Sequence, residues 1–216
     1  LTTDFVRTLK CDGEGGIWIA GLYGKLLRYY PKSGKALYYN INQVKEINII
    51  KPGCISVASS SGLYILDYSL GFKAPGTSCN LRKIANVDIS GMYFSRPNVL
   101  WYGTDGMGVY CYNITKRKSL NFSMKNGLAS NYIYSVQIDR NNRIWLTTNK
   151  GFSMILPLRN HKYKIVNLGY GEINDAEMLP VSSIQTHDGN FIYGTTEGAV
   201  LFNPLKYDFS EYKAPM

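Results

Sequence analysis

The sequence offers few side chains suited to acid–base catalysis. Its two histidines, His161 and His187, fall in segments expected to be exposed turns, and no histidine pair points to a metal-dependent lyase. Several carboxylates could act as acids, but nothing in their spacing indicates two of them at the separation that glycoside hydrolysis requires: Asp105, Glu172, Asp175, Glu177 and Asp188. We therefore expect no catalytic residues. The alternative is a secreted enzyme of the glycoside hydrolase or lyase type.

Metal, cofactor and phosphate sites are not indicated either. Two glycine-rich runs, 13–16 and 103–108, are not followed by a helix, so they predict hairpin turns and not phosphate loops. The cysteines have no C-x-x-C pair and no metal-like spacing: Cys11, Cys54, Cys79 and Cys111. We expect no metal and no cofactor, and the pairing of the cysteines stays open because a sequence cannot assign it.

Charge narrows the classes of partner. The 216 residues include 24 Lys and Arg against 15 Asp and Glu, a formal net charge of +9, which raises the local concentration of an anionic partner. The basic clusters at 116–118 and 159–164 lie in expected turns and lack the interleaved aromatic residues of a nucleic-acid stacking platform. No run approaches the roughly 18 apolar residues of a membrane span. We expect neither nucleic-acid binding nor membrane contact by this segment.

The strongest pattern is an internal repeat. Trp18, Trp101 and Trp145 align in one column, with Ser56 and Ile192 at the equivalent positions of two further copies. The five positions are 38, 45, 44 and 47 residues apart, close to the roughly 40–50 residues of a β-propeller blade. The spacing therefore predicts five blades.

Each repeat divides into four short strand-like runs separated by turns rich in Asn, Asp and Gly, as tight hairpins require. No segment has a sustained helical period. These features predict an all-β fold, a β-propeller of four-stranded antiparallel blades, with about five blades in this chain. We expect a single propeller fragment over residues 1–216, with these blade ranges: 1–42, 43–86, 87–128, 129–172 and 173–216.

Large rings on the second strand of each blade are expected to fill the wedge between neighbouring blades. Small residues beside them, such as Gly103 and Gly194, would let the backbones approach. This interpretation gives the rings a role in packing, in preference to a ladder for stacking a ligand. The residues expected to form the blade core are Trp18, Trp101, Trp145 and Tyr193.

Two stretches resemble a known family, the two-component-regulator propeller repeat. Residues 1–7, 16–19 and 26–35 resemble its Leu-Ser-Ser-Asn-like start, Trp-Ile-Gly-Thr-like centre and Arg-Tyr-Asp-Pro-like strand end. Residues 127–145 match equally well, and all five repeats fit with varying fidelity, so the resemblance covers nearly the whole chain. Departures are Ser56 in place of Trp, Tyr30 where Asp is usual, and the missing start of the second repeat.

The resemblance implies that the five blades are part of a seven-bladed or larger propeller. It also implies a function. It implies the periplasmic sensor region of a Bacteroides-type hybrid two-component system, recognising a carbohydrate breakdown product and passing the signal to a histidine kinase, with the parent protein a homodimer. The basic charge leads us to hypothesise an acidic oligosaccharide, sulfated or containing uronic acid. A protein-interaction scaffold without a small ligand is the remaining alternative.

The ligand would meet the face onto which the strand 2–3 turns and the blade-to-blade connections open. Tyrosine rings that stack on sugars, with amide and carboxylate partners for hydroxyl groups, are the expected lining. The predicted ligand-binding residues are Tyr23, Asp105, Lys150, Glu197, Asn131 and Tyr132. Further candidates lie in the blade-to-blade connections: Asp4, Glu172, Asn174 and Asp175.

Overall fold

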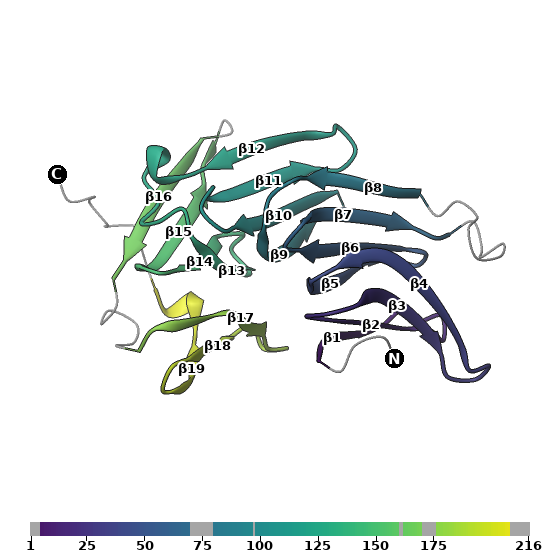
Figure 1. Cartoon of the computed structure of the whole chain (residues 1–216). Coiled ribbons are helices and arrows are strands. Elements are labelled where there is room, and N and C mark those ends of the chain that lie inside the picture. Colours follow the sequence, from purple (N-terminus) through teal and green to yellow (C-terminus); the bar gives the residue numbers. More distant parts are fainter. Residues whose placement is uncertain (1–4, 70–79, 97, 160–161, 170–175, 208–216) are drawn as a thin grey trace. The chain divides into compact units, whose positions relative to one another are not determined.

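A computed structural model describes residues 5–69, 80–96, 98–159, 162–169 and 176–207. The described chain is all-β, with nineteen strands and two short 3-10 turns, η1 (Met124–Asn126) and η3 (Pro204–Lys206). Every strand pairs antiparallel with its sequence neighbour in one of five sheets, which are the blades of a β-propeller (Figure 1). The predicted fold class is confirmed. The chain divides into two compact units, Leu1–Ser90 and Gly91–Met216.

The first unit holds blades 1 and 2. Each is a sheet of four strands in sequence order. Blade 1 comprises β1 (Val6–Cys11), β2 (Ile17–Gly21), β3 (Lys25–Tyr30) and β4 (Lys35–Asn42). Blade 2 comprises β5 (Val44–Lys51), β6 (Cys54–Ser59), β7 (Gly62–Asp67) and β8 (Asn80–Ala85). The innermost strands β1 and β5 contact each other, and one hydrophobic cluster joins the two blades.

The second unit holds blades 3, 4 and 5. Blade 3 comprises β9 (Ile89–Arg96), β10 (Val99–Thr104), β11 (Val109–Asn113) and β12 (Lys118–Phe122). Blade 4 comprises β13 (Ile133–Ile138), β14 (Ile144–Thr148), β15 (Gly151–Pro157) and β16 (Tyr163–Leu168). Blade 5 has three described strands, β17 (Met178–Gln185), β18 (Phe191–Thr195) and β19 (Gly198–Phe202). Strand β13 contacts both β10 and β17, so blade 4 joins the other two.

The tryptophan column lies in the cores between blades. Trp18 of blade 1 packs against Tyr68 of blade 2, with ring centroids 5.3 Å apart. Trp145 of blade 4 packs edge-on against Phe202 of blade 5 at 4.9 Å. Both tryptophans are fully buried, as is Tyr193, and Trp101 is almost so. A large ring therefore fills the interface that its blade makes with the following one.

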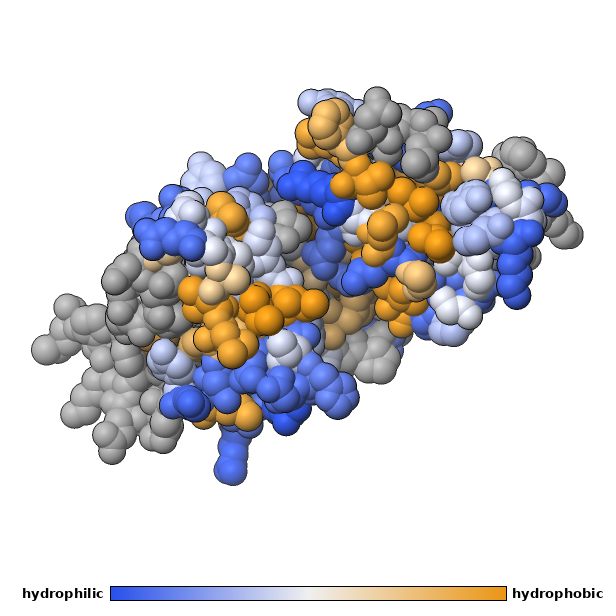
Figure 2. Space-filling view, turned by 90° about the horizontal axis from the view of Figure 1, so that it is seen from below, coloured by the Kyte–Doolittle hydropathy of each residue, from blue (hydrophilic) through white to orange (hydrophobic). Residues whose placement is uncertain are grey.

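Tyr193 and Ile192 face opposite sides of blade 5 because side chains alternate along a strand. The ring of Tyr193 packs against the ring of Phe152 in blade 4, with centroids 5.3 Å apart. Ile192 belongs to the tryptophan column and is only half-buried. Its neighbours across the sheet, Ile184 and Leu201, are exposed. Apolar side chains gather in two places on the surface shown in Figure 2. Membership of a larger propeller stays a prediction.

A buried ion pair anchors the first hairpin of blade 1. Asp12 Oδ1 accepts hydrogen bonds from the backbone N–H groups of Glu14 (2.7 Å) and Gly16 (2.9 Å). Its Oδ2 accepts from Arg28 Nε at 2.7 Å, and the guanidinium lies 4.2 Å from the ring centroid of Tyr68. Burial raises the pKa of Asp12, but the two backbone donors and Arg28 outweigh burial and hold that pKa below its ordinary value.

Blade 4 repeats this arrangement with a polar link to blade 5. Asp139 accepts hydrogen bonds from Arg143 Nε (2.6 Å) and Trp145 Nε1 (2.8 Å). Arg143 then donates to the carbonyl oxygens of Pro204 (2.6 Å) and Tyr207 (2.7 Å) at the end of blade 5. The aspartates of these hairpins thus hold arginines that contact the next blade.

Candidate functional site

The turns between strands 2 and 3 share one hydrogen-bonding device in four of the five blades. The last residue of strand 2 is Ser or Thr, and its hydroxyl donates to the carbonyl of the glycine that opens strand 3 or immediately precedes it. The pairs are Ser59 with Gly62 (3.1 Å), Thr104 with Gly108 (2.7 Å), Thr148 with Gly151 (2.9 Å) and Thr195 with Gly198 (3.3 Å). Blade 1 has Gly21 at this position, so its turn lacks the hydroxyl.

The blade 1 turn instead exposes a tyrosine. Gly24 has a φ of 97°, a left-handed conformation that glycine adopts without strain. Leu22 N–H donates to the Phe5 carbonyl at 3.2 Å, and the Tyr23 ring meets the Phe5 ring edge-on at 6.0 Å. Tyr23 remains 61% exposed. The turn therefore holds a largely solvent-facing ring at the edge of blade 1.

The outer strand of blade 1 continues this surface. Along β4, Tyr39 and Ile41 point into the hydrophobic cluster, so the alternating residues Tyr38, Asn40 and Asn42 share the opposite face. All three are exposed, and half of the Tyr38 surface is accessible. β4 thus presents one ring and two amides in a row.

A single residue, Gln43, connects β4 to β5. It has a φ of 51°, and its carbonyl accepts a hydrogen bond from Ser60 N–H at 3.2 Å. A left-handed conformation costs a non-glycine residue about 1 kcal/mol or more, and such strain concentrates at functional sites. The other two non-glycine residues described with positive φ, Arg117 and Asn142, lie in hairpin turns. Gln43 is therefore held in a strained conformation at the junction of two blades.

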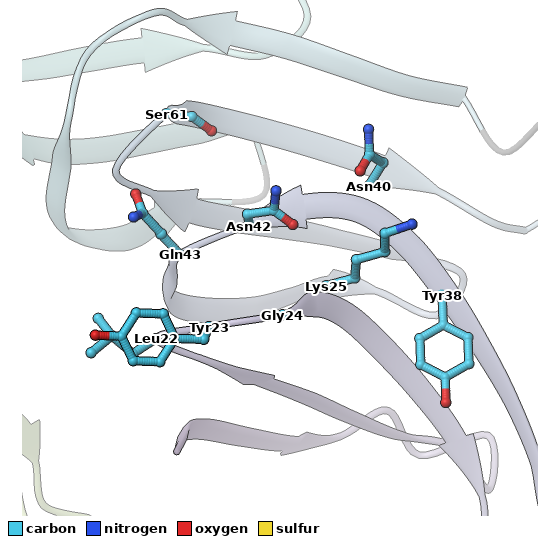
Figure 3. Close-up of a pocket in the computed structure, with 9 residues that line it drawn as sticks. All are labelled: Leu22, Tyr23, Gly24, Lys25, Tyr38, Asn40, Asn42, Gln43 and Ser61. Carbon is cyan, nitrogen blue, oxygen red and sulfur yellow. The ribbon is translucent and has the colours of Figure 1, made fainter. Parts of the chain in front are cut away.

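These features line one groove of about 860 Å³ in the first unit (Figure 3). In this view Tyr23, Gln43 and Ser61 lie towards one end, Tyr38 and Asn40 towards the other. The full lining is Leu22, Tyr23, Gly24, Lys25, Tyr38, Asn40, Asn42, Gln43 and Ser61. Two exposed rings and three side-chain amides suit stacking on sugar rings and hydrogen bonding to hydroxyl groups.

Of the predicted ligand-binding residues, Tyr23 lies in this groove. Three others, Asp105, Asn131 and Tyr132, meet in the second unit, where Asp105 and Tyr132 form an isolated β-bridge. Tyr132 is half exposed. The Asn131 carbonyl accepts from Gly106 (3.2 Å) and Gly108 (2.9 Å), and its Oδ1 accepts from Met124 N–H at 2.8 Å. Both oxygens of Asn131 thus hold the surrounding turns together.

Lys150 and Glu197 occupy the strand 2–3 turns of blades 4 and 5. Both are exposed, and their backbone N–H groups donate to the hydroxyls of Thr148 (3.0 Å) and Thr195 (3.3 Å). The structure shows these residues in hydrogen-bonded turns, and their ligand contacts stay predictions. Some candidates lie outside the described residues: Asp4, Glu172, Asn174 and Asp175.

Most of the groove lining was not predicted from the sequence. The predicted residues do not include Lys25, Tyr38, Asn40, Asn42 or Gln43. Three of these, Tyr38, Asn40 and Asn42, lie on the outer strand β4, whereas the predicted residues lie in turns and blade-to-blade connections. The signal in the sequence is the alternation Tyr-Asn-Ile-Asn over positions 39–42. That period places one face of the strand in the core and the other in solvent.

Two of the raised pKa values in the described part of the chain bear on possible chemistry. Burial, with Glu177 and Asp105 nearby, raises the pKa of Tyr134. Burial also raises the pKa of Cys111 to about 11, which leaves a poorly nucleophilic thiol. Cys11 and Cys54 are also free thiols, while Cys79 lies outside the described residues. Within the described ranges, no three His, Cys, Asp or Glu side chains are placed to hold a metal ion.

Similarity to known proteins agrees with the blade architecture. Residues 127–150 match the family described as the two component regulator propeller. Histidine kinase P4 of Formosa agariphila is 26% identical over 181 residues, covering 76% of this chain and 13% of that protein. The extracellular domain of the hybrid two component system BT4673 of B. thetaiotaomicron aligns over 93% of this chain and 29% of that one, with a TM-score of 0.74 and 19% identity.

Enzymes are also found among the proteins of similar fold. A luciferin-regenerating enzyme aligns over 94% of this chain and 76% of its own, with a TM-score of 0.62 and 14% identity. At that identity the likeness concerns the fold alone. The part of the chain that the structure describes contains no helix with the length and hydropathy of a membrane span.

The predicted resemblance is confirmed: the chain carries a two-component-regulator propeller repeat. It shares its propeller fold with the extracellular domain of the BT4673 hybrid two component system. The chain spans about an eighth of the histidine kinase and less than a third of the BT4673 structure.

Proposed function

We propose that this chain is a non-catalytic, periplasmic sensing domain that binds a carbohydrate breakdown product in the blade 1 groove and passes the signal to a histidine kinase. The observation that carries the proposal is the lining of that groove. Two exposed tyrosine rings, Tyr23 and Tyr38, flank a row of amides from Asn40, Asn42 and Gln43. Related proteins supply the signalling context.

The groove favours binding over catalysis of polysaccharide cleavage. Its nine described lining residues include no Asp, Glu or His, whereas glycoside hydrolysis ordinarily needs a pair of carboxylates. Amide side chains offer donors and acceptors without a titratable proton. A sugar in this groove would be held and left intact.

Signalling requires that the ligand bind two states of the domain with different affinity. The groove is built from both blades of the first unit, because Gln43 connects them and Ser61 belongs to the second. A saccharide that contacts both blades would favour the packing that brings these contacts together. In a homodimer of the parent protein, such a shift would alter the geometry of the kinase.

The test is calorimetric titration of the 216-residue chain with a panel of oligosaccharides. Tyr23→Ala removes a stacking ring worth about 1 kcal/mol, so the affinity of a bound saccharide should fall roughly fivefold to tenfold. Tyr132→Ala is the matched control, because it removes a ring of similar exposure from the second unit.

We expect Tyr132→Ala to bind as tightly as the unmodified chain. A loss confined to Tyr132→Ala would place the site in the second unit, and release of shorter sugars from the panel would make the chain an enzyme.

A further inference from the structure

One cation lies among the neutral groups of the groove. Lys25 opens β3 and pairs across the sheet with Asn42 of β4. It is exposed, and it is the one charged side chain among the nine described lining residues. Figure 3 shows its side chain among those of Asn40, Asn42 and Tyr38. A ligand in the groove would therefore meet a positive charge beside an aromatic ring.

The Lys25 ammonium has no ionic partner within the described part of the chain. The ion pairs found there belong to Arg28, Lys45 and Arg143. Its neighbours in the groove are amides and rings, which leave the charge uncompensated. An ammonium group offers three hydrogen-bond donors, and bonds from it to an anionic oxygen are stronger than neutral ones.

We propose, building on the proposed function, that the groove selects an anionic saccharide and that Lys25 binds its carboxylate or sulfate group. The rings of Tyr23 and Tyr38 at the two ends of the groove stack on the sugar units, and the amides of Asn40, Asn42 and Gln43 bind the hydroxyl groups. The net charge of +9 raises the local concentration of such a ligand, while Lys25 supplies the selectivity.

Two pairs of probes separate the anion from the sugar. The first pair is tetragalacturonate and its fully methyl-esterified form, which keep the same rings and differ in charge. The second is a chondroitin sulfate tetrasaccharide and its desulfated form, which tests sulfate against the remaining carboxylates. Affinities are measured by calorimetry for the unmodified chain, for Lys25→Met and for Lys35→Met. Lys35 is an exposed lysine of the same blade outside the groove lining, so its variant removes an equal charge.

The unmodified chain should bind the more highly charged member of at least one pair about five- to tenfold more tightly than the methyl-esterified or desulfated member. Lys25→Met should abolish that difference, and Lys35→Met should keep it. The pair that shows the difference identifies the anion as carboxylate or sulfate.

Two results would overturn this inference and leave the proposed function standing. One is equal or tighter binding of both the methyl-esterified and the desulfated saccharide, and the other is a charge preference that survives in Lys25→Met. Binding of no saccharide, charged or neutral, would contradict the proposed function itself.

Discussion

At the scale of single residues, Asp12 shows how the first hairpin of blade 1 is held. Its carboxylate is fully buried beside Arg28, whereas Glu14, which approaches the same guanidinium at 3.2 Å, is 42% exposed. Removing one partner of a buried ion pair leaves an uncompensated charge, while an exposed pair contributes little. The two carboxylates should therefore differ in their contribution to stability although they share an arginine.

We predict that Asp12→Asn lowers the free energy of unfolding by about 3 kcal/mol at pH 7, while Glu14→Gln changes it by less than about 1 kcal/mol. Urea denaturation followed by tryptophan fluorescence measures both. An equal decrease in the free energy of unfolding of the two variants would contradict the claim that Asp12 stabilises this hairpin more than Glu14 does.

The lowered pKa of Asp12 also predicts how this difference depends on pH. Because the pKa is lower in the folded than in the unfolded chain, the contribution is present above the unfolded value, near 4. It is lost as the pH falls through the folded pKa. The gap between the unmodified chain and Asp12→Asn should accordingly shrink below about pH 4, and a constant gap from pH 7 to pH 2 would refute this reading.

At the scale of elements, the residues of the tryptophan column differ in how deeply they are buried. Trp145 is fully buried against blade 5, whereas Ile192, its counterpart in that blade, is half-buried. Deleting a buried ring removes its transfer free energy and leaves a cavity. Truncation of Trp145 and truncation of Ile192 should therefore lower the free energy of unfolding by different amounts.

We expect Trp145→Ala to cost about 3–5 kcal/mol of unfolding free energy, and Ile192→Ala no more than about 1.5 kcal/mol. Thermal or urea unfolding of the two variants provides the measurement. A larger loss for Ile192→Ala would show that its face of blade 5 is well packed.

The blades could be predicted from the sequence because their signals are local and repeated. The tryptophan spacing and the Asn-, Asp- and Gly-rich turns located all five sheets, including blade 2, where Ser56 replaces the ring.

The site was harder to predict from the sequence, because it depends on contacts between elements. Asn131 has the right chemistry for a sugar, yet its two oxygens are used by Met124 and the neighbouring glycine turn. No sequence pattern reveals that competition.

Tyr23 could be predicted because it occupies a recognisable turn. Tyr38 and Asn40 could not be assigned in the same way, since their exposure follows from the orientation of β4, whose other face is buried with Tyr39 and Ile41. Gln43 could not be predicted for a different reason. Its left-handed conformation is imposed by a one-residue connection between blades.

At the scale of the whole molecule, the chain combines a strongly basic surface with a mostly neutral groove. The net charge of +9 results from 24 basic and 15 acidic residues, and Lys25 is the one basic residue among the described groove lining. The long-range attraction of an anionic ligand by the net charge and its selection by Lys25 are therefore separate properties. Added salt should weaken the long-range attraction more than the selection by Lys25, because exposed charges are screened over about 10 Å at 0.1 M ionic strength.

The central claim is that a saccharide binds in the blade 1 groove of this propeller domain. The most direct measurement is a nuclear magnetic resonance titration of the isotope-labelled chain with a saccharide that binds in calorimetry. The account predicts unchanged signals at Asp105, Asn131 and Tyr132. It predicts saturable shift changes at these groove residues: Tyr23, Lys25, Tyr38, Asn40, Asn42 and Gln43. Shift changes confined to the second unit, with the groove signals unmoved, would contradict it.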